Sequence, residues 1–397
     1  MGLGIGFLKD FCSMTVEQLL KLIRDEHLDF LAAETKVNHQ VKKLEGAVIF
    51  KLVLFSMLST EKVSLRIMET FLHSARFKQF SQTGDVNAKF NSIRDRICTI
   101  NVEFFKQLFE SIFELYNKQL KEEKAITKAD STYVSIAASL VEWSMRNGTS
   151  SNGPKHIKYS VALKGSLPCS IRVFNESKFL NENLALGQLI ENSIALKESV
   201  VVFDRGLMSR NTFESFTEKD IHFVGRCNPQ YYCKASISNT LPVMPENSTI
   251  NITKDETGFL RSHNNTLTKK KYRMVSGTIN KTGYPICFVT NLMEEDAYSI
   301  AAIYKERWEI ELFFKFIKQH LNIKHLVSRQ KNGIEVMLYM TMITAILILV
   351  FKKLNRISSY KIAKLKFELQ LDNILIKEIV TLCGGDPGKA SHLWNTS

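Results

Sequence analysis

Three carboxylate residues in separate parts of the sequence have the surroundings needed for metal-dependent chemistry. Asp130 lies inside the β-rich run 126–136, and Asp204 ends the apolar run Val200–Phe203 just before a glycine-containing turn. A carboxylate in an apolar strand loses hydration unless something pairs with it. Ligands also gather at the carboxyl ends of strands in α/β sheets. Taken alone, either aspartate could equally be a loop or helix-cap residue.

The third carboxylate belongs to a polar stripe on a predicted helix over Ile303–Leu321. At about 100° per residue, four side chains of this helix fall within an arc of roughly 60°: Tyr304, Arg307, Glu311 and Lys318. An ordinary salt bridge at i,i+4 would explain Arg307 with Glu311. It would not explain the other two members of the stripe, nor the two aspartates upstream.

Three acids brought to one place repel one another unless divalent cations neutralise them. A site of oxygen ligands suits Mg²⁺ or Mn²⁺, and a pair of such ions about 3.5–4 Å apart catalyses phosphoryl transfer. We therefore predict that Asp130, Asp204 and Glu311 are catalytic and ligate two magnesium ions. The net charge of +13, from 53 Lys and Arg against 40 Asp and Glu, favours a polyanionic partner. Charge alone would fit DNA or an anionic membrane surface.

The same residues resemble the insertion-sequence-four family of bacterial DDE transposases. Three motifs carry the resemblance: Ala129-Asp130-Ser-Thr132, Val202-Phe-Asp204-Arg-Gly206, and Tyr304-x-x-Arg307-x-x-x-Glu311-x-x-x-x-x-x-Lys318. It covers about residues 125–351 and implies a ribonuclease-H-like fold. It also implies magnesium-dependent cut-and-paste transposition of double-stranded DNA through a hairpin intermediate, by a homodimer in a synaptic complex. The implied location is the bacterial cytoplasm, in association with the nucleoid.

The resemblance also implies DNA contacts. Tyr304, Arg307 and Lys318 are expected to contact phosphates, and Trp308 to stack on an extruded base, although a packed tryptophan is equally consistent with the sequence. Better-known family members use an aromatic residue of the insertion for the hairpin. All three tryptophans of this chain lie outside its insertion, and Tyr284 is the candidate substitute. A basic run in the insertion is predicted to follow the phosphate backbone, or to be a solubilising strand edge: Lys269, Lys270, Lys271 and Arg273.

The elements that position these residues form a predicted α/β chain of four segments. Helical periodicity from Val16 to about Lys124 predicts a helical first segment, residues 1–124, which we expect to bind DNA. Short strands and then alternating strands and helices over 125–228 predict a mixed sheet flanked by helices. Residues 229–295 are rich in Thr, Asn, Ser and Lys and look like a β-rich insertion. Residues 296–397 are predicted to complete the catalytic domain and to add C-terminal helices.

Three other functions remain open at this stage. A nuclease or resolvase of the same fold would cleave DNA without joining it, and a relic would bind DNA without cleaving it. A membrane-surface protein would need an exposed apolar face on a basic helix. The longest apolar stretch, Val336–Phe351, is shorter than a membrane span and contains two threonines, so we predict a buried helix.

Overall fold

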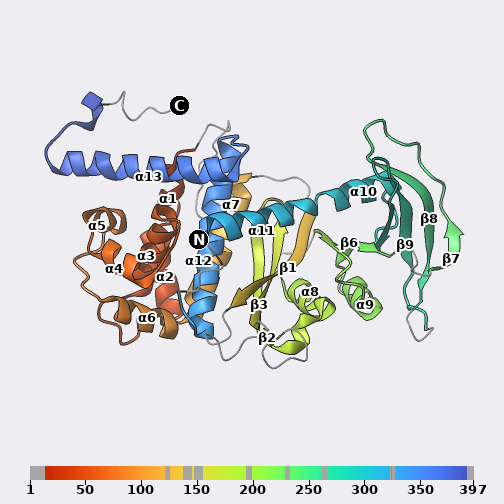
Figure 1. Cartoon of the computed structure of the whole chain (residues 1–397), viewed down its shortest axis with the longest axis horizontal. Coiled ribbons are helices and arrows are strands. Elements are labelled where there is room, and N and C mark those ends of the chain that lie inside the picture. The colour runs from red at the N-terminus through yellow and green to blue at the C-terminus, as the bar shows by residue number, and fades with distance from the viewer. Residues whose placement is uncertain are drawn as a thin grey trace. The chain divides into compact units, whose positions relative to one another are not determined.

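The computed structural model describes residues 14–120, 126–136, 145–146, 155–193, 199–228, 233–261, 266–321, 323 and 327–390. The chain forms two compact units (Figure 1). The first contains residues 1–121 and 316–397, and the second contains residues 122–315. The C-terminal helices therefore belong to the same unit as the N-terminal helices, a grouping that the linear division of the sequence did not include. The predicted boundaries at 124/125 and 228/229 fall in or beside segments outside the described residues.

The first unit is helical, as the periodicity predicted. Its helices are α1 (Val16–Lys21), α2 (Asp25–Glu34), α3 (Gly46–Ser59), α4 (Leu65–Leu72), α5 (Ala75–Ser81), α6 (Phe90–Thr99), α7 (Val102–Leu120), α12 (Lys331–Leu354) and α13 (Tyr360–Leu382), followed by the 3₁₀ turn η3 (Pro387–Ala390). The N-terminal ends of α1, α4, α5 and α13 are capped by Thr15, Ser64, Ser74 and Ser359, whose side chains accept backbone N–H bonds.

Helix α12 is the central helix of this unit. It contacts α3, α6, α7 and α13. By length and composition alone it could cross a membrane, but 89% of its most apolar window is buried inside the structure. A soluble core helix passes the same test. The predicted buried helix is therefore confirmed.

The second unit is built on a ten-stranded mixed sheet, counted over the described residues. Its strands are β1 (Ile126–Ile136), β2 (Met145–Arg146), β3 (Lys155–Lys164), β4 (Leu167–Phe174), β5 (Val200–Phe203), β6 (His222–Cys227), β7 (Cys233–Ser238), β8 (Ile250–Leu260), β9 (Tyr272–Ile279) and β10 (Pro285–Thr290). Its helices are the 3₁₀ turn η1 (Ser177–Leu180), α8 (Glu182–Glu191), α9 (Arg210–Glu218), α10 (Ala297–Lys305) and α11 (Trp308–His320), which extends past the unit boundary.

The strand order identifies the predicted fold. β4, β3 and β1 pair antiparallel, and β5 and β6 then follow on the other side of β1, parallel to it. Helix α8 connects the antiparallel part to β5, and α9 connects β5 to β6. This is the order of a ribonuclease-H-like sheet, so the predicted fold class is confirmed.

Helices cover both faces of this sheet. Val202, Val224 and Phe288 pack against Ile300 of α10 on one face. On the other face, the rings of Phe203 and Phe223 pack against Phe213 of α9. Successive residues of β5 thus face opposite layers, which explains why this strand is a continuous apolar run.

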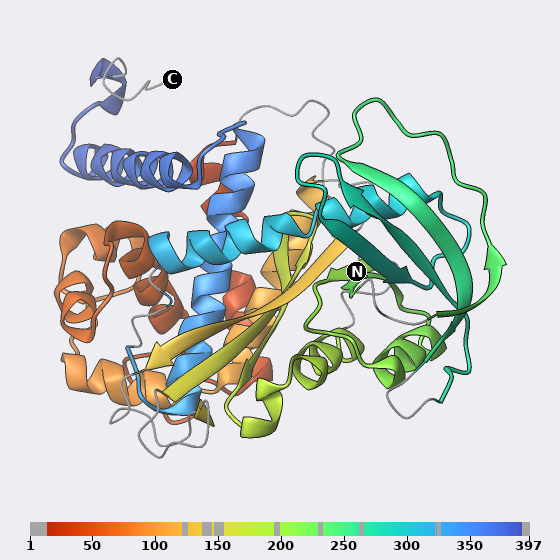
Figure 2. The ribbon, with the colours of Figure 1, turned by 45° about the vertical axis from the view of Figure 1, so that its right-hand side comes forward.

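The predicted insertion continues the same sheet. β10 pairs with β6, and β9, β8 and β7 follow in order, so the strands of this segment extend the sheet alongside α10 (Figure 2). β8 runs over eleven residues to Leu260. Its middle contains the charged residues Lys254, Asp255 and Glu256, which are unusual in a strand. Asp255 can be buried there because Arg273 on β9 pairs with its carboxylate.

Candidate active site

Two of the three predicted acids are brought together by the sheet. β1 and β5 pair in parallel with Ile126 opposite Val200 and Lys128 opposite Val202. The same register places Asp130 opposite Asp204, one residue beyond the end of β5. Residues at the same position of neighbouring parallel strands point to the same face. Asp204 therefore lies at the carboxyl end of β5, where α/β sheets hold ligands, and Asp130 lies opposite it within β1.

The turn after Asp204 needs its glycine because another acidic side chain packs on it. A Cβ atom on Gly206 would lie 2.5 Å from Cγ of Glu182, the first residue of α8. Glu182 thereby reaches the vicinity of Asp130. Burial raises the pKa of Asp130 to about 6, and the charges of Glu182 and Asp204 act in the same direction. The N–H of Ser131, which donates to Asp130 Oδ1 over 2.7 Å, opposes the shift.

The helix predicted over Ile303–Leu321 is interrupted near its start, so that prediction was wrong there. α10 ends at Lys305 and α11 begins at Trp308. In the turn between them, the N–H groups of Glu306 and Arg307 donate to the carbonyls three residues earlier. Such bonds tighten the backbone into a 3₁₀-like turn. Tyr304 therefore belongs to α10, Arg307 to the turn, and Glu311 to α11.

Arg307 connects the third acid to the first. Its Nη2 donates to Glu311 Oε1 over 2.5 Å, and its Nη1 lies 3.7 Å from Asp130 Oδ2. The side chain of Arg307 is 9% exposed, so the guanidinium holds two carboxylates in a largely buried place. Glu311 is accordingly directed toward the site by an ion pair.

Tyr304 contacts the second of the two aspartates, Asp204. Its hydroxyl donates to Asp204 Oδ1 over 3.1 Å, and its ring packs against Phe288. Burial, and then the charge of Asp204, raise the pKa of Tyr304 to about 12, so the hydroxyl stays a donor. Tyr304 therefore contacts Asp204 directly, and its predicted contact with a DNA phosphate stays a prediction.

Lys128 is a site residue that the sequence reasoning missed. It precedes Asp130 by two residues, on the same face of β1, and its side chain is 2% exposed. Its Nζ lies 3.2 Å from Glu306 Oε2 and 3.0 Å from Glu309 Oε2, and donates to the carbonyl of Gly165 over 3.1 Å. Lys128 therefore fastens the turn that carries Arg307 to β1. A lysine inside an apolar strand was the available signal.

Glu182 was missed as well. Lys158, whose side chain is fully buried, pairs with its Oε2 and also donates to the carbonyl of Phe179 over 3.0 Å. The other oxygen of Glu182 is buried without a hydrogen-bond partner among the described residues. Nothing in the sequence marks Glu182, because a glutamate in the first turn of a helix is ordinary.

The remaining predicted DNA contacts differ in exposure. Trp308 is 58% exposed, which excludes the packed tryptophan, and Tyr284 is 69% exposed. Lys318 lies two turns beyond Glu311 on α11. The side chains of Lys269, Lys270 and Lys271 are exposed, with Lys271 Nζ 5.8 Å from the ring centre of Phe259.

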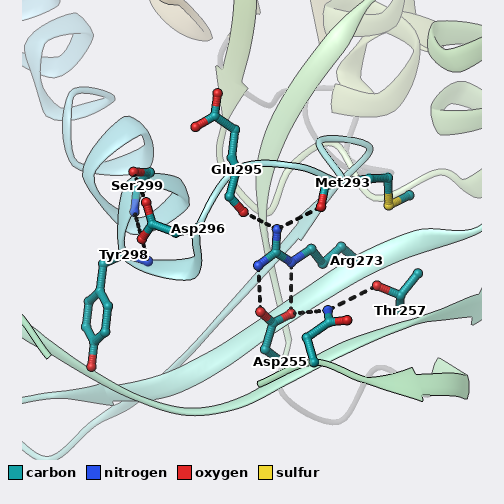
Figure 3. Close-up of polar contacts among 9 residues, drawn as sticks. Asp255, Thr257, Arg273, Met293, Glu295, Asp296, Tyr298 and Ser299 are labelled. Carbon is teal, nitrogen blue, oxygen red and sulfur yellow. Dashed lines mark hydrogen bonds and ion pairs between the residues drawn. The ribbon is translucent and has the colours of Figure 1, made fainter. Parts of the chain in front are cut away.

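Arg273 does not fit the prediction that it contacts DNA. It is buried and pairs with Asp255 through Nε at 2.9 Å and Nη2 at 2.6 Å (Figure 3). Its Nη1 donates to the backbone carbonyls of Met293 and Glu295. The guanidinium thus connects β9 to β8 and to the segment that leads into α10. The three lysines before it remain the exposed part of the basic run.

Comparison with known proteins decides the family. Residues 129–347, more than half of the chain, match the model described as the transposase DDE domain. The chain belongs to the transposase DDE domain family. The matched segment begins beside Asp130 and includes Asp204 and Glu311.

Two relatives agree with this assignment. A Geobacillus stearothermophilus protein with the name "Probable transposase for insertion sequence element IS5377" is 25% identical over 306 residues, 73% of this chain and 77% of that protein. A Synechocystis protein named as a transposase for insertion sequence element IS4SA is 50% identical over 50 residues, 13% and 14% of the two chains. The predicted resemblance to insertion-sequence-four DDE transposases is confirmed.

A solved structure also resembles this transposase. The piggyBac transposase in a synaptic complex with hairpin DNA aligns with a TM-score of 0.42 and 10% identity, over 92% of this chain and 82% of that one. At this TM-score, the fold assignment rests on the strand order of the transposase itself.

The donor chemistry of the site suits a divalent cation. Asp130, Asp204 and Glu311 offer carboxylate oxygens only, the ligands that Mg²⁺ and Mn²⁺ prefer. Among the described residues, no three His, Cys, Asp or Glu side chains are gathered closely enough to hold a metal. Glu311 pairs with Arg307, whose Nη1 lies 3.7 Å from Asp130 Oδ2. The three carboxylates are therefore the kind of ligand that a magnesium site needs. The guanidinium of Arg307 lies between the carboxylates of Glu311 and Asp130.

Proposed function

We propose that this DDE transposase is a cut-and-paste enzyme that binds the terminal inverted repeats of an insertion sequence, cleaves the DNA ends and joins them to target DNA. The observation that carries the proposal is the position of Asp130 on β1 opposite Asp204 at the end of β5, with Glu311 tethered through Arg307. Such an acidic centre in a chain of net charge +13 suits a polyanionic substrate.

We propose that Asp130, Asp204 and Glu311 hold magnesium, or manganese in its place, as a pair of ions. Bound there, the ions would activate the attacking oxygen and stabilise the leaving oxygen of a phosphodiester. Tyr304 holds Asp204 by its hydroxyl, and Lys128 holds the turn before Glu311. The protein thereby fixes where its acids lie before substrate arrives.

The proposed DNA contacts follow from charge and exposure. A phosphate that enters the site competes with Glu311 for Arg307, because it accepts the same two parallel bonds as a carboxylate. Lys318 supplies a point charge further along α11. Exposed Trp308 offers a face on which a base can stack. The helical segment 1–124 is proposed to bind the terminal repeats, and the protein to work as a homodimer near the bacterial nucleoid.

Replacing Glu311 by Gln tests the catalytic assignment. The amide keeps the size of the side chain but removes the charge, so magnesium-dependent cleavage of end DNA should fall by at least about a thousandfold, as expected when a group acting at the transition state is lost. Binding to the terminal repeats, measured by mobility shift, should stay within a few-fold of wild type. Unchanged cleavage would remove Glu311 from the site.

Strand transfer separates the proposal from its alternatives. With precut ends carrying free 3′-hydroxyls, a transposase produces joined products in a target plasmid, whereas a nuclease or resolvase of the same fold produces none. A relic binds the ends and neither cleaves nor joins them. Glu311→Gln is the matched control, because its products define the background.

A further inference from the structure

Helix α13 has an apolar face that the described residues of its own unit leave exposed. Ala363, Phe367, Leu371 and Leu375 form its buried side. Six large apolar side chains of the helix are between 36% and 73% exposed, one third of all such side chains in the described part of the chain: Ile362, Leu365, Leu369, Ile376, Ile379 and Leu382. Exposed apolar surface concentrated on one element marks an interaction site.

Five of these residues form a regular stripe. Ile362, Leu369 and Ile376 follow one another at intervals of seven residues. Leu365, Asp372 and Ile379 form a second series with the same interval. Alternating steps of three and four residues are the a and d positions of a coiled coil. At 1.5 Å per residue the stripe is about 26 Å long. It points about 150° away from the buried side, at 100° per residue.

We propose that this stripe, Ile362, Leu365, Leu369, Ile376 and Ile379, binds the same stripe of a second copy of the chain in an antiparallel coiled coil. The inference deepens the homodimer of the proposed function by assigning its surface and orientation. A helical heptad stripe is matched best by another helix of the same period. A second copy supplies that helix without any further partner.

Charge decides the orientation. In a parallel pair, Asp372 would face its own counterpart within the apolar seam, and Lys361 would lie near Lys366 of the other copy. Like charges in such positions are destabilising. In an antiparallel pair, Ile362 faces the other copy's Ile379, and Leu365 faces its Ile376. Asp372 then faces a leucine, and Arg76 of α5 already pairs with its carboxylate.

The oligomeric state of the full-length protein tests the surface. By light scattering after gel filtration, the wild type should have twice the mass of the 45.4 kDa chain, and Leu369→Lys should weaken the dimer by at least tenfold. Leu184→Lys, at a similarly exposed position of α8, is the matched control and should remain dimeric. A monomeric wild type, or a Leu369→Lys protein that dimerises like wild type, overturns the proposal. Circular dichroism confirms that each variant is folded.

Cysteine cross-linking tests the orientation. Cys383 is exposed and is first changed to Ser, so that it does not cross-link. In this background, the double variant Leu365→Cys with Ile376→Cys should form a disulfide-linked dimer under mild oxidation. Neither single variant should do so. Cross-linking of the single variants would establish a parallel pair and overturn the antiparallel arrangement. These measurements are independent of cleavage, since Glu311→Gln should dimerise normally. Loss of cleavage alone therefore contradicts the proposed function, and loss of dimerisation alone contradicts this inference.

Discussion

Asp130 is held in the structure at an energetic cost. Its pKa of about 6, against 3.8 for an unperturbed aspartate, means that the folded chain favours the neutral carboxyl group because burial disfavours the charge. A group with a raised pKa contributes stability that is present below the unfolded value and is lost as pH rises through the folded value. In magnesium-free buffer this contribution should therefore be lost between about pH 4 and pH 6.

Asp130→Asn should accordingly stabilise the protein while abolishing cleavage. Near pH 7 in magnesium-free buffer, its free energy of unfolding should exceed that of wild type by about 1–2 kcal/mol. The difference should shrink toward zero as the pH is lowered to about 4, since the wild-type carboxyl group is then neutral in both states. Urea unfolding at several pH values measures it. A constant difference across the range would contradict the assigned pKa.

Lys128 gives a second prediction at the scale of single residues. Lys128→Met keeps the length of the side chain but releases Glu306 and Glu309, so the turn that carries Arg307 should move. Cleavage should slow by about 10- to 100-fold, the effect expected of a misplacement near 1 Å, while end binding is retained. The concentration of magnesium needed for half-maximal cleavage should rise as well.

Lys128→Arg is the conservative control, because it restores the charge, and it should recover part of the rate. If Lys128→Met cleaves like wild type at every magnesium concentration, Lys128 has no positioning role. A lower unfolding midpoint with unchanged magnesium dependence would indicate a purely structural role.

The sequence was enough to predict which acidic residues form the site, but not which residues contact them. Asp130, Asp204 and Glu311 could be selected because carboxylates are unusual in their apolar surroundings. Their contacts with Tyr304 and Lys128 depend on register between distant segments, and a single sequence does not contain that information. Residues of β1 pair with residues of β5 that lie 74 positions later, and Asp204 lies 74 positions after Asp130. The pairing of the two strands in the structure is needed to see that the aspartates are opposite each other.

At the scale of elements, the interrupted helix is the instructive error. Residues 303–321 have helical periodicity throughout, because a 3₁₀-like turn of two residues hardly alters the spacing of apolar side chains. Lys128 selects the turn by pairing with glutamates on both sides of Arg307. The periodicity therefore predicted which residues share a face, but not where the backbone breaks.

The buried ion pair between Arg273 and Asp255 gives the prediction at this scale. Arg273→Met leaves a buried carboxylate without its partner and releases the carbonyls of Met293 and Glu295, so unfolding should become easier by about 3–5 kcal/mol. Arg273→Met combined with Asp255→Leu should lose much less, because no charge is left unpaired. Urea unfolding of the two variants measures both values. Equal losses would show that the ion pair itself is not the stabilising feature.

The same ion pair links the insertion to the catalytic helices. The segment that Arg273 holds ends at Asp296, whose carboxylate accepts the N–H groups of Tyr298 and Ser299 at the start of α10. α10 then leads directly to Tyr304 and the Arg307 turn. An apparently DNA-binding arginine is therefore part of the framework that sets the position of the site.

At the scale of the whole molecule, the positive charge is unevenly divided. Residues 1–121 and 316–397 contain 29 Lys and Arg against 19 Asp and Glu, a surplus of 10, whereas residues 122–315 contain 24 against 21, a surplus of 3. The catalytic unit is nearly balanced because its acids offset its lysines. DNA affinity should therefore depend strongly on the helical unit, and on local clusters such as Lys269–Lys271 in the catalytic unit.

The salt dependence of DNA binding tests whether that cluster contacts phosphates. Changing Lys269, Lys270 and Lys271 together to Gln should weaken binding to end DNA and reduce the slope of log affinity against log salt by about 2–3, since each neutralised phosphate contributes about 0.9. The matched control changes three lysines of the same unit that are exposed and ion-paired with glutamates: Lys178, Lys219 and Lys254. Both variants remove the same net charge. If their slopes fall equally, the cluster acts only through the total charge, and its predicted contact with the DNA backbone is wrong.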